Sequence, residues 1–193
     1  MEGIALRVIE RPKRNEIDEI ARLISEGGVI VYPTDTVYGL GGNALSRDVV
    51  DRIYSIKRRE KSKPVSIAMS KDMLSSYVEI GLRERILIDK YLPGKYTLIL
   101  RKKRGVSLPE EVAPEGKVGV RVPDHPFVKS LFERIDFPII STSANISGEK
   151  PPSTVEEAMS QLGDAVDLYV DWGKLPGTPS RVIDLTKGFE ILR

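Results

Sequence analysis

Tyr32–Asn43, which reads YPTDTVYGLGGN, is the stretch that decides the fold. It follows the apolar run Gly28–Val31, which is typical of a buried strand. Threonines, an aspartate and glycines directly after a strand supply short hydrogen-bonding groups and let a ligand approach the backbone closely. A second stretch of this kind, Ser141–Gly148 (STSANISG), follows the apolar run Phe137–Ile140. Either stretch alone could be an elaborate turn, but the two together predict two walls of one site.

The hydrophobic pattern around these stretches mixes strand and helix periods without strict alternation. This pattern disfavours a purely parallel, doubly wound sheet and predicts an α/β fold with a twisted, mixed sheet flanked by helices. A chain of 193 residues fits one domain with a substantial core, so a single domain over residues 1–193 is expected. We expect strands at residues 4–9, 29–32, 65–69, 96–101, 118–122, 167–170, 181–185 and 189–192, and helices at residues 15–26, 47–56, 83–91, 126–134 and 154–162.

The composition excludes several classes of protein. The chain has no cysteine, which excludes disulfides, thiolate nucleophiles and cysteine metal sites, and its single histidine cannot build a histidine-rich metal site. A formal net charge of +2 does not by itself predict a nucleic-acid-binding protein. Residues 1–11 lack the apolar core of a signal peptide and no run reaches the length of a membrane span, so we expect a cytoplasmic protein without membrane contact.

Two motifs that suggest nucleotide binding are weak. Gly39–Ala44 fits the dinucleotide pattern G-x-G-x-x-A, but Pro33–Tyr38 separate it from the preceding strand, whereas a dinucleotide site needs the first glycine almost at once. Gly94-Lys95 lacks the glycine-rich lead of a phosphate-binding loop. If the chain binds ATP, it does so by another route.

Each of the main charged residues allows a structural and a functional interpretation. The composition of Lys57–Lys63 (KRREKSK) by itself favours a solvated helix end, and the alternative is that its cations clamp a polyphosphate. Arg121 lies within VGVRV, so if buried it needs an anion, from either an internal or a substrate carboxylate. His125, between Asp124 and Pro126, is predicted to cap a helix rather than act as a base.

With these residues in view, the chain resembles the YrdC-like family, and most closely its threonylcarbamoyl-AMP synthases. The resemblance covers nearly the whole chain, with the motifs in the family's order, which makes it far more specific than one motif. It implies the short, single-domain form, a curved mixed sheet and a large basic concave cleft. The matching segments are YPTDTVYGL, Lys57–Arg59, Leu92–Leu100 (LPGKYTLIL), Gly119–Pro126 (GVRVPDHP), STSANISG and Pro179–Asp184 (PSRVID).

The family's activity is implied by the same resemblance. It is the ATP-dependent synthesis of L-threonylcarbamoyl-adenylate from L-threonine, bicarbonate and ATP, with release of pyrophosphate, for the threonylcarbamoyladenosine modification of tRNA. Mg²⁺ would arrive with ATP, and no metal-ligating residues are expected. A separate threonylcarbamoyl transferase complex would use the product, and contact with tRNA or double-stranded RNA stays open.

The site residues follow from matching the family's motifs to this chain. Its Lys-x-Arg and Ser-x-Asn patterns match Lys57 with Arg59 and Ser143 with Asn145, which implies that these four surround the nucleotide. Lys57 and Arg59 would be the catalytic cations, because charge on the transferring phosphate needs stabilisation. The resemblance further implies nucleotide contacts at Lys63 and Ser153, and L-threonine contacts at Thr34, Arg121 and Ser180.

Departures from the family pattern keep two alternatives open. Ala68 stands where many synthases have histidine, Arg181 replaces a threonine, Glu60 replaces a proline and Asp35 replaces a glutamate. These differences leave open a YrdC-like paralogue that acts on a different amine or carbamoyl donor. The second alternative is a structured-RNA-binding module without turnover, although no aromatic residue lies in Lys57–Lys63 to stack on bases.

Overall fold

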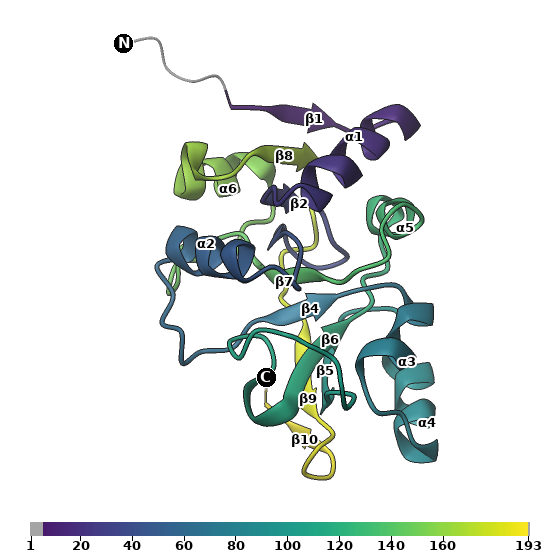
Figure 1. Cartoon of the computed structure of the whole chain (residues 1–193). Helices are drawn as coiled ribbons and strands as arrows, with labels where there is room; N and C mark the ends of the chain where they lie inside the picture. The colour runs from purple at the N-terminus through teal and green to yellow at the C-terminus, as the bar shows by residue number, and fades with distance from the viewer. Residues whose placement is uncertain (1–5, 193) are drawn as a thin grey trace.

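A computed structural model describes residues 6–192, whose strands form one mixed sheet (Figure 1). The strands are β1 (Val8–Glu10), β2 (Ile30–Tyr32), β3 (Gly39–Gly41), β4 (Ser66–Ala68), β5 (Tyr96–Arg101), β6 (Lys117–Arg121), β7 (Ile139–Ser143), β8 (Leu168–Asp171), β9 (Arg181–Asp184) and β10 (Glu190–Ile191). Their order across the sheet is β1-β8-β2-β3-β7-β4-β6-β5-β9-β10. The sheet contains parallel pairs such as β4 with β6 and antiparallel pairs such as β5 with β6, which confirms the predicted mixed sheet. Of the strand expected at residues 4–9, residues 4 and 5 lie outside the described part of the chain.

The helices are α1 (Arg14–Ser25), α2 (Arg47–Lys57), α3 (Leu74–Tyr77), α4 (Leu82–Tyr91), α5 (Pro126–Phe132) and α6 (Val155–Leu162). Short 3₁₀ turns lie at Lys71–Met73, Pro114–Gly116 and Gly163–Ala165. None of the helices within residues 6–192 is long and apolar enough to cross a membrane. The turn and helix at residues 71–77 were not expected from the sequence, because four residues of α3 are too few for a helical period.

Helix starts show which caps the sequence predicts correctly. Ser46 accepts a hydrogen bond from the backbone N–H of Val49 at the start of α2, as expected for an N-cap serine. The helix expected at residues 15–26 begins one residue earlier, at Arg14, and its N-cap is Lys13. There the Glu16 carboxylate accepts from the backbone N–H of Lys13 at 2.7 Å, so an acid in the first turn satisfies the free donor.

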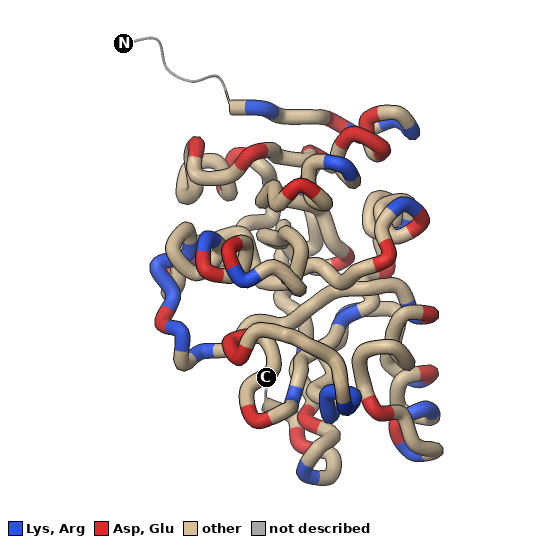
Figure 2. The backbone as a smooth tube through the Cα atoms, viewed as in Figure 1, with Lys and Arg blue, Asp and Glu red and all other residues tan. Residues whose placement is uncertain are grey.

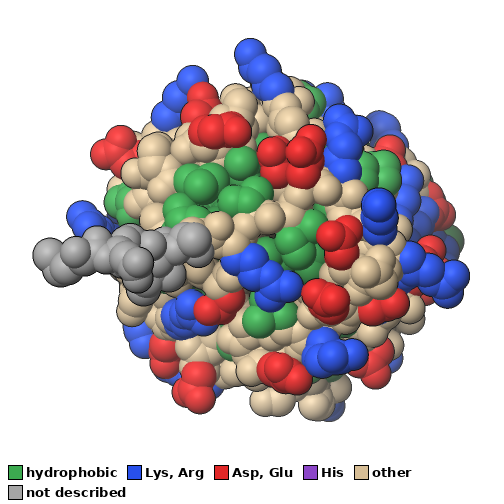
Figure 3. Space-filling view, turned by 90° about the horizontal axis from the view of Figure 1, so that it is seen from above, with side chains coloured by type: hydrophobic (Ala, Val, Ile, Leu, Met, Phe, Trp, Pro, Cys, Tyr) green, Lys and Arg blue, Asp and Glu red, His purple; other side chains and the backbone are tan. Residues whose placement is uncertain are grey.

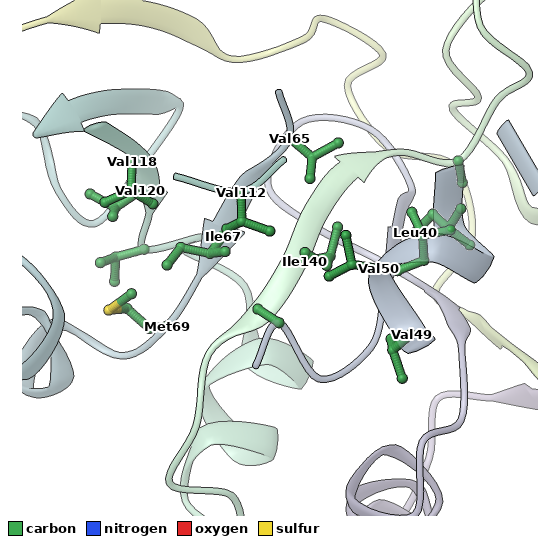
Figure 4. Packing of buried hydrophobic residues seen from close by; sticks show 14 of the residues in the cluster. Leu40, Val49, Val50, Val65, Ile67, Met69, Val112, Val118, Val120 and Ile140 are labelled. Atoms are coloured by element: carbon green, nitrogen blue, oxygen red, sulfur yellow. The ribbon is translucent and has the colours of Figure 1, made fainter. Parts of the chain in front are cut away.

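Helices cover both faces of the sheet, and strand residues alternate between the two core clusters that result (Figure 1). Ile30 belongs to the cluster that includes α1 and α5, whereas its neighbour Val31 belongs to the cluster that includes α2 and α6. Successive side chains of a strand point to opposite faces, which produces this division. Figure 4 shows Val50 of α2 packed beside Ile140 of β7, so α2 rests directly on the strand that carries the second polar stretch.

The first polar stretch turns back into the sheet as β3, which the sequence interpretation treated as loop. β3 pairs with β7, with Gly39 opposite Ser143 and Leu40 opposite Thr142. Glycine is needed at position 41, because a Cβ there would lie 2.6 Å from the Ile140 carbonyl oxygen. The two polar stretches, about one hundred residues apart in the sequence, are therefore neighbouring strands, which confirms that they belong together.

Candidate functional site

A pocket of about 570 Å³ opens over the part of the sheet formed by β3, β7, β4, β6, β5 and β9. Along β5 the side chains alternate, since Leu98 lies in the core while Thr97 and Ile99 line the pocket. Along β6 the same alternation puts Val120 in the core and Arg121 in the pocket wall. The period of two in the strands thus divides these residues between the core and the site.

The pocket wall carries both signs of charge. Arg59, Lys117 and Arg121 line it together with the acids Glu115 and Asp184. The basic character of the cleft therefore stays a prediction. In Figure 2 the basic segment that leaves α2 runs down the left edge of the chain. On the face seen from above in Figure 3, cations and acids are interspersed rather than gathered into a patch of one sign.

Arg121 forms a buried ion pair within the pocket wall. Its guanidinium nitrogen Nη2 lies 2.9 Å from Asp35 Oδ1 and donates a second hydrogen bond to Thr36 Oγ1 at 3.2 Å. Both charged side chains are less than a tenth exposed. The sequence offered an internal or a substrate carboxylate as the partner of Arg121, and the structure supplies the internal one. Because Arg121 also lines the pocket, it can still meet a ligand anion there.

Thr34 lies behind the pocket wall rather than in it. Its Oγ1 donates to the Val37 carbonyl at 2.7 Å and accepts from the Thr36 backbone N–H at 3.1 Å. Such local bonds hold a serine or threonine turn. Thr36 and Val37 line the pocket, so Thr34 shapes the turn that presents them. Its contact with L-threonine stays a prediction.

Ser180 does line the pocket, and it is bonded to a residue that the sequence did not single out. Its hydroxyl lies 2.9 Å from Thr97 Oγ1, and both residues belong to the pocket lining. Tyr96 pairs with Arg181 where β5 runs parallel to β9, and that pairing brings the two hydroxyls together. A threonine beside the aliphatic run Leu98–Leu100 of this strand was the signal that could have identified Thr97.

The Lys-x-Arg and Ser-x-Asn motifs each send one residue into the pocket wall and one behind it. Arg59 and Ser143 line the pocket. Lys57 is only 1% exposed, and its Nζ donates to the carbonyl oxygens of Ser143 and Asn145, the latter at 2.7 Å. Burial, together with the nearby positive charge of Arg59, lowers the pKa of Lys57 to about 7.

Arg59 and Asn145 are held by backbone carbonyls. The guanidinium of Arg59 donates to the carbonyls of Lys63 and Pro64, at 2.9 Å each. The amide of Asn145 donates to the carbonyls of Ile146 and Glu149, again at 2.9 Å. The buried Oδ1 of Asn145 has no hydrogen-bond partner among residues 6–192.

The two weaker nucleotide contacts lie outside the pocket lining. Lys63 is exposed, and its ammonium lies 3.2 Å from Glu60. Ser153 is bonded to Glu157 through both its backbone N–H, at 2.6 Å, and its hydroxyl, at 3.1 Å. Pro151 lines the pocket two residues before Ser153, so this segment borders the site. The roles of Lys63 and Ser153 stay predictions.

Asp184 is a further pocket residue that sequence reasoning missed. Its Oδ1 accepts from the backbone N–H and the hydroxyl of Thr186, at 2.7 Å each, and its carboxylate is largely buried in the wall. Among residues 6–192 no group of three or more histidine, cysteine, aspartate or glutamate side chains could hold a metal ion. Asp184 therefore contributes one carboxylate rather than part of a metal cage.

His125 performs the capping role that the sequence predicted. Its Nδ1 accepts from the backbone N–H of Phe127 at 3.2 Å, at the start of α5. Burial lowers the pKa of His125 to about 4, so the ring is neutral and can accept this bond at neutral pH.

Comparisons with known proteins agree with one another. The sequence model of the Sua5, YciO and YrdC proteins, described as "Telomere recombination", matches residues 22–193. A putative threonylcarbamoyl-AMP synthase of Methanocaldococcus jannaschii is 36% identical over 178 residues, which are 91% of this chain and 83% of that protein.

Two solved structures share the fold. The Sua5 of Pyrococcus abyssi in complex with L-threonine has a TM-score of 0.90 at 32% identity, over 98% of this chain and 57% of that one. The YciO of Escherichia coli has a TM-score of 0.87 at 29% identity, over 97% of this chain and 94% of that one. The chain thus spans little more than half of the Pyrococcus protein and nearly all of the Escherichia protein.

Proposed function

Because the chain belongs to the Sua5, YciO and YrdC family, we propose that it makes L-threonylcarbamoyl-adenylate. The reaction joins L-threonine, bicarbonate and ATP and releases pyrophosphate and water. The observation that carries the proposal is that Arg59 and Ser143 line the same pocket as Arg121 and Ser180. Arg59 and Ser143 suit a phosphate, whereas Arg121 and Ser180 suit the carboxylate of an amino acid and its neighbouring groups. A relative of the same fold was solved with L-threonine bound.

The amino-acid end of the pocket holds and orients the nucleophile. The Arg121 guanidinium, fixed by Asp35, has a rigid fork that pairs with a carboxylate. Ser180 and Thr97 offer hydroxyls that donate or accept as the substrate requires. Bound there, the amine of threonine adds to carbon dioxide or bicarbonate to give a carbamate, and a carbamate oxygen then attacks the α-phosphorus of ATP.

The phosphate end stabilises charge rather than forming a covalent bond. Phosphoryl and nucleotidyl transfer depend on positioning and on cations placed where negative charge develops. Arg59 is the cation of the Lys-x-Arg motif that lines the pocket, and the Ser143 hydroxyl lies in the same wall. The absence of cysteine agrees with a reaction that needs no thiol nucleophile.

Magnesium enters the proposal with ATP. Mg²⁺ prefers oxygen ligands, keeps several waters and is commonly held by one or two carboxylates plus substrate phosphates. The Asp184 carboxylate and the wall hydroxyls fit that donor set. When bound, the ion would neutralise charge on the phosphates. The proposal also places the chain in the cytoplasm, where its product would pass to a threonylcarbamoyl transferase complex that modifies tRNA.

The proposal is tested by pyrophosphate release from Mg-ATP and bicarbonate, with and without L-threonine. Release that depends on threonine, and is absent with serine or glycine at the same concentration, is the expected result. Arg59→Gln is expected to lower turnover, and Arg121→Met to raise the apparent KM for threonine more than that for ATP. Unchanged kinetics in both variants would remove the assignment of these residues.

A paralogue with another amine substrate is the second candidate, and the residue beside Arg121 favours it. Ala68 pairs with Arg121 across β4 and β6, so a small side chain stands next to the anchor of the amino acid. The similarity to YciO over 94% of that protein also fits a single-domain paralogue. ATP binding without threonine-dependent pyrophosphate release would favour this candidate, and a panel of other amines would then identify the substrate.

A further inference from the structure

Lys57 does not line the pocket, but it connects the end of α2 to the Ser143–Ser147 segment at the end of β7. Residues 143 and 145, whose carbonyls bond its ammonium, lie 86 and 88 positions further along the chain. The backbone carbonyl of Lys57 also accepts from the N–H of Ser147 at 2.8 Å. Side chain and backbone of one residue at the end of α2 thus hold both ends of the Ser143–Ser147 turn.

The turn that Lys57 holds is a tight one. The Asn145 N–H bonds the Ser143 carbonyl at 2.9 Å, two residues back, and the Ala144 N–H bonds the Tyr38 carbonyl at 2.9 Å. A hydrogen bond between residues i and i+2 is that of a three-residue turn. The Lys57 ammonium, only 1% exposed, adds a second donor to the Ser143 carbonyl and also donates to the Asn145 carbonyl.

We propose that Lys57 is a positioning residue, which fixes the Ser143–Ser147 turn so that the Ser143 hydroxyl stays in the pocket wall, and that Arg59 alone of the Lys-x-Arg pair meets phosphate. The inference rests on the proposed function only for its kinetic part. It assigns Lys57 a different role from the phosphate contact that the sequence pattern implies. It also explains why Lys57 and Ser143 occur together, because the Lys57 ammonium bonds the Ser143 carbonyl.

The role requires N–H donors and not the positive charge itself. A neutral amine keeps two N–H groups, which match the two carbonyls that Lys57 bonds. Arg59 is the charged group that acts on Lys57, and the two like charges disfavour each other. Loss of the Lys57 proton therefore leaves the turn in place, whereas a residue that neutralised phosphate would lose its function on deprotonation.

The first experiment is hydrogen exchange of the 143–149 segment in wild type, Lys57→Met and Lys63→Met. Lys57→Met is expected to speed exchange of these amides about 10–100-fold, the factor for losing a hydrogen bond to a charged group. Lys63→Met, which removes an exposed cation from the same basic segment, should leave exchange unchanged. This readout needs no substrate, so it tests the turn even if the proposed reaction is wrong. Unchanged exchange in Lys57→Met would overturn the inference.

Kinetics then separate positioning from phosphate contact. Lys57→Met is expected to lower kcat about 100-fold, as a misplaced group can, with the KM for threonine unchanged. In a Ser143→Ala background the same substitution should cost much less, because the group it positions is already gone. Equal losses in both backgrounds would overturn the inference.

Two further measurements cover the case in which Lys57→Met does not fold. Lys57→Gln keeps two N–H donors without charge and is expected to retain more activity than Lys57→Met. The kcat of the wild type should show no loss with a midpoint near pH 7, the value to which burial lowers the pKa of Lys57. A loss of kcat with that midpoint, absent in Lys57→Gln, would show that the charge acts on phosphate and would refute the positioning role.

Discussion

Arg121 forms a buried ion pair and also lines the pocket, where the proposed function assigns it to the threonine carboxylate, and two substitutions separate these two roles. Arg121→Met leaves the Asp35 carboxylate without the cation it meets at 2.9 Å. The other carboxylate oxygen, Asp35 Oδ2, has no hydrogen-bond partner within residues 6–192, so little else compensates the buried charge. Breaking a buried pair costs about 3–5 kcal/mol, and we expect about 3 kcal/mol because the pocket admits water on one side.

The assay is urea unfolding followed by circular dichroism, with the fluorescence of the single tryptophan, Trp172, as a second probe. With a slope of about 2 kcal/mol per molar urea, a loss of about 3 kcal/mol lowers the unfolding midpoint by about 1.5 M. The matched variant Arg121→Met with Asp35→Leu replaces both charges by apolar groups. It should recover stability to within about 1 kcal/mol of the wild type, since replacing a whole buried pair is often close to neutral.

Substrate recognition should not recover with stability. Both variants lack the guanidinium that the proposed function pairs with the threonine carboxylate, so both should bind threonine about 10–100-fold more weakly, as loss of a charged hydrogen bond implies. Threonine titration by calorimetry measures this directly. An Arg121→Met protein as stable as the wild type would refute the ion-pair reasoning. A double variant with normal threonine-dependent turnover would refute the assignment of Arg121 to the substrate.

Three further predictions concern the backbone and the buried titratable groups. Gly41→Ala should lower the unfolding free energy by about 1–3 kcal/mol, because its Cβ would lie 2.6 Å from the Ile140 carbonyl oxygen and 2.7 Å from the Tyr32 ring; an unchanged urea midpoint would contradict this. Burial lowers the pKa of His125 from 6.5 to about 4, so between these pH values the unfolded chain binds more protons than the folded one. The wild type should therefore lose stability relative to His125→Asn as the pH falls from 6.5 towards 4. Urea midpoints at pH 7.5 and 4.5 measure this, and parallel losses in both proteins would exclude the histidine. Burial lowers the pKa of Lys57 from 10.5 to about 7, so between these pH values the unfolded chain binds more protons than the folded one. The wild type should therefore gain stability relative to Lys57→Met as the pH rises from 7 to 10. Urea midpoints of the two proteins that change in parallel would contradict this prediction.

The sequence predicted the elements of the fold because their patterns are local. The strand at Tyr96–Arg101 was predicted to the residue, since its flanking residues and its apolar content both favour a strand. The helix at residues 47–56 was predicted to start where it does because Ser46, a serine before an apolar helical period, is a strong start signal. β3 was missed because Gly39–Gly41 has no strand propensity of its own and forms a strand only between β2 and β7.

For the site, the sequence identified the relevant segments more reliably than the role of each residue. Arg59, Ser143, Arg121 and Ser180 all line one pocket, and the motif match selected them before any geometry was known. The same match selected Lys57, whose ammonium bonds two carbonyls behind the wall. A motif shows which residues occur together, but which of two residues at i and i+2 faces a ligand depends on how the helix end meets the neighbouring strand.

By itself the sequence determined a mixed α/β fold, the absence of thiol chemistry and the two polar stretches that border the site, because composition, periodicity and motif order are properties of the chain. Only the tertiary structure decided that Asp35 is the partner of Arg121 and that Lys57 holds the Ser143–Ser147 turn. These contacts join segments 86 or more positions apart. Such pairs are set by the order of strands in the sheet and by the twist that brings one strand end beside another, which no local pattern records.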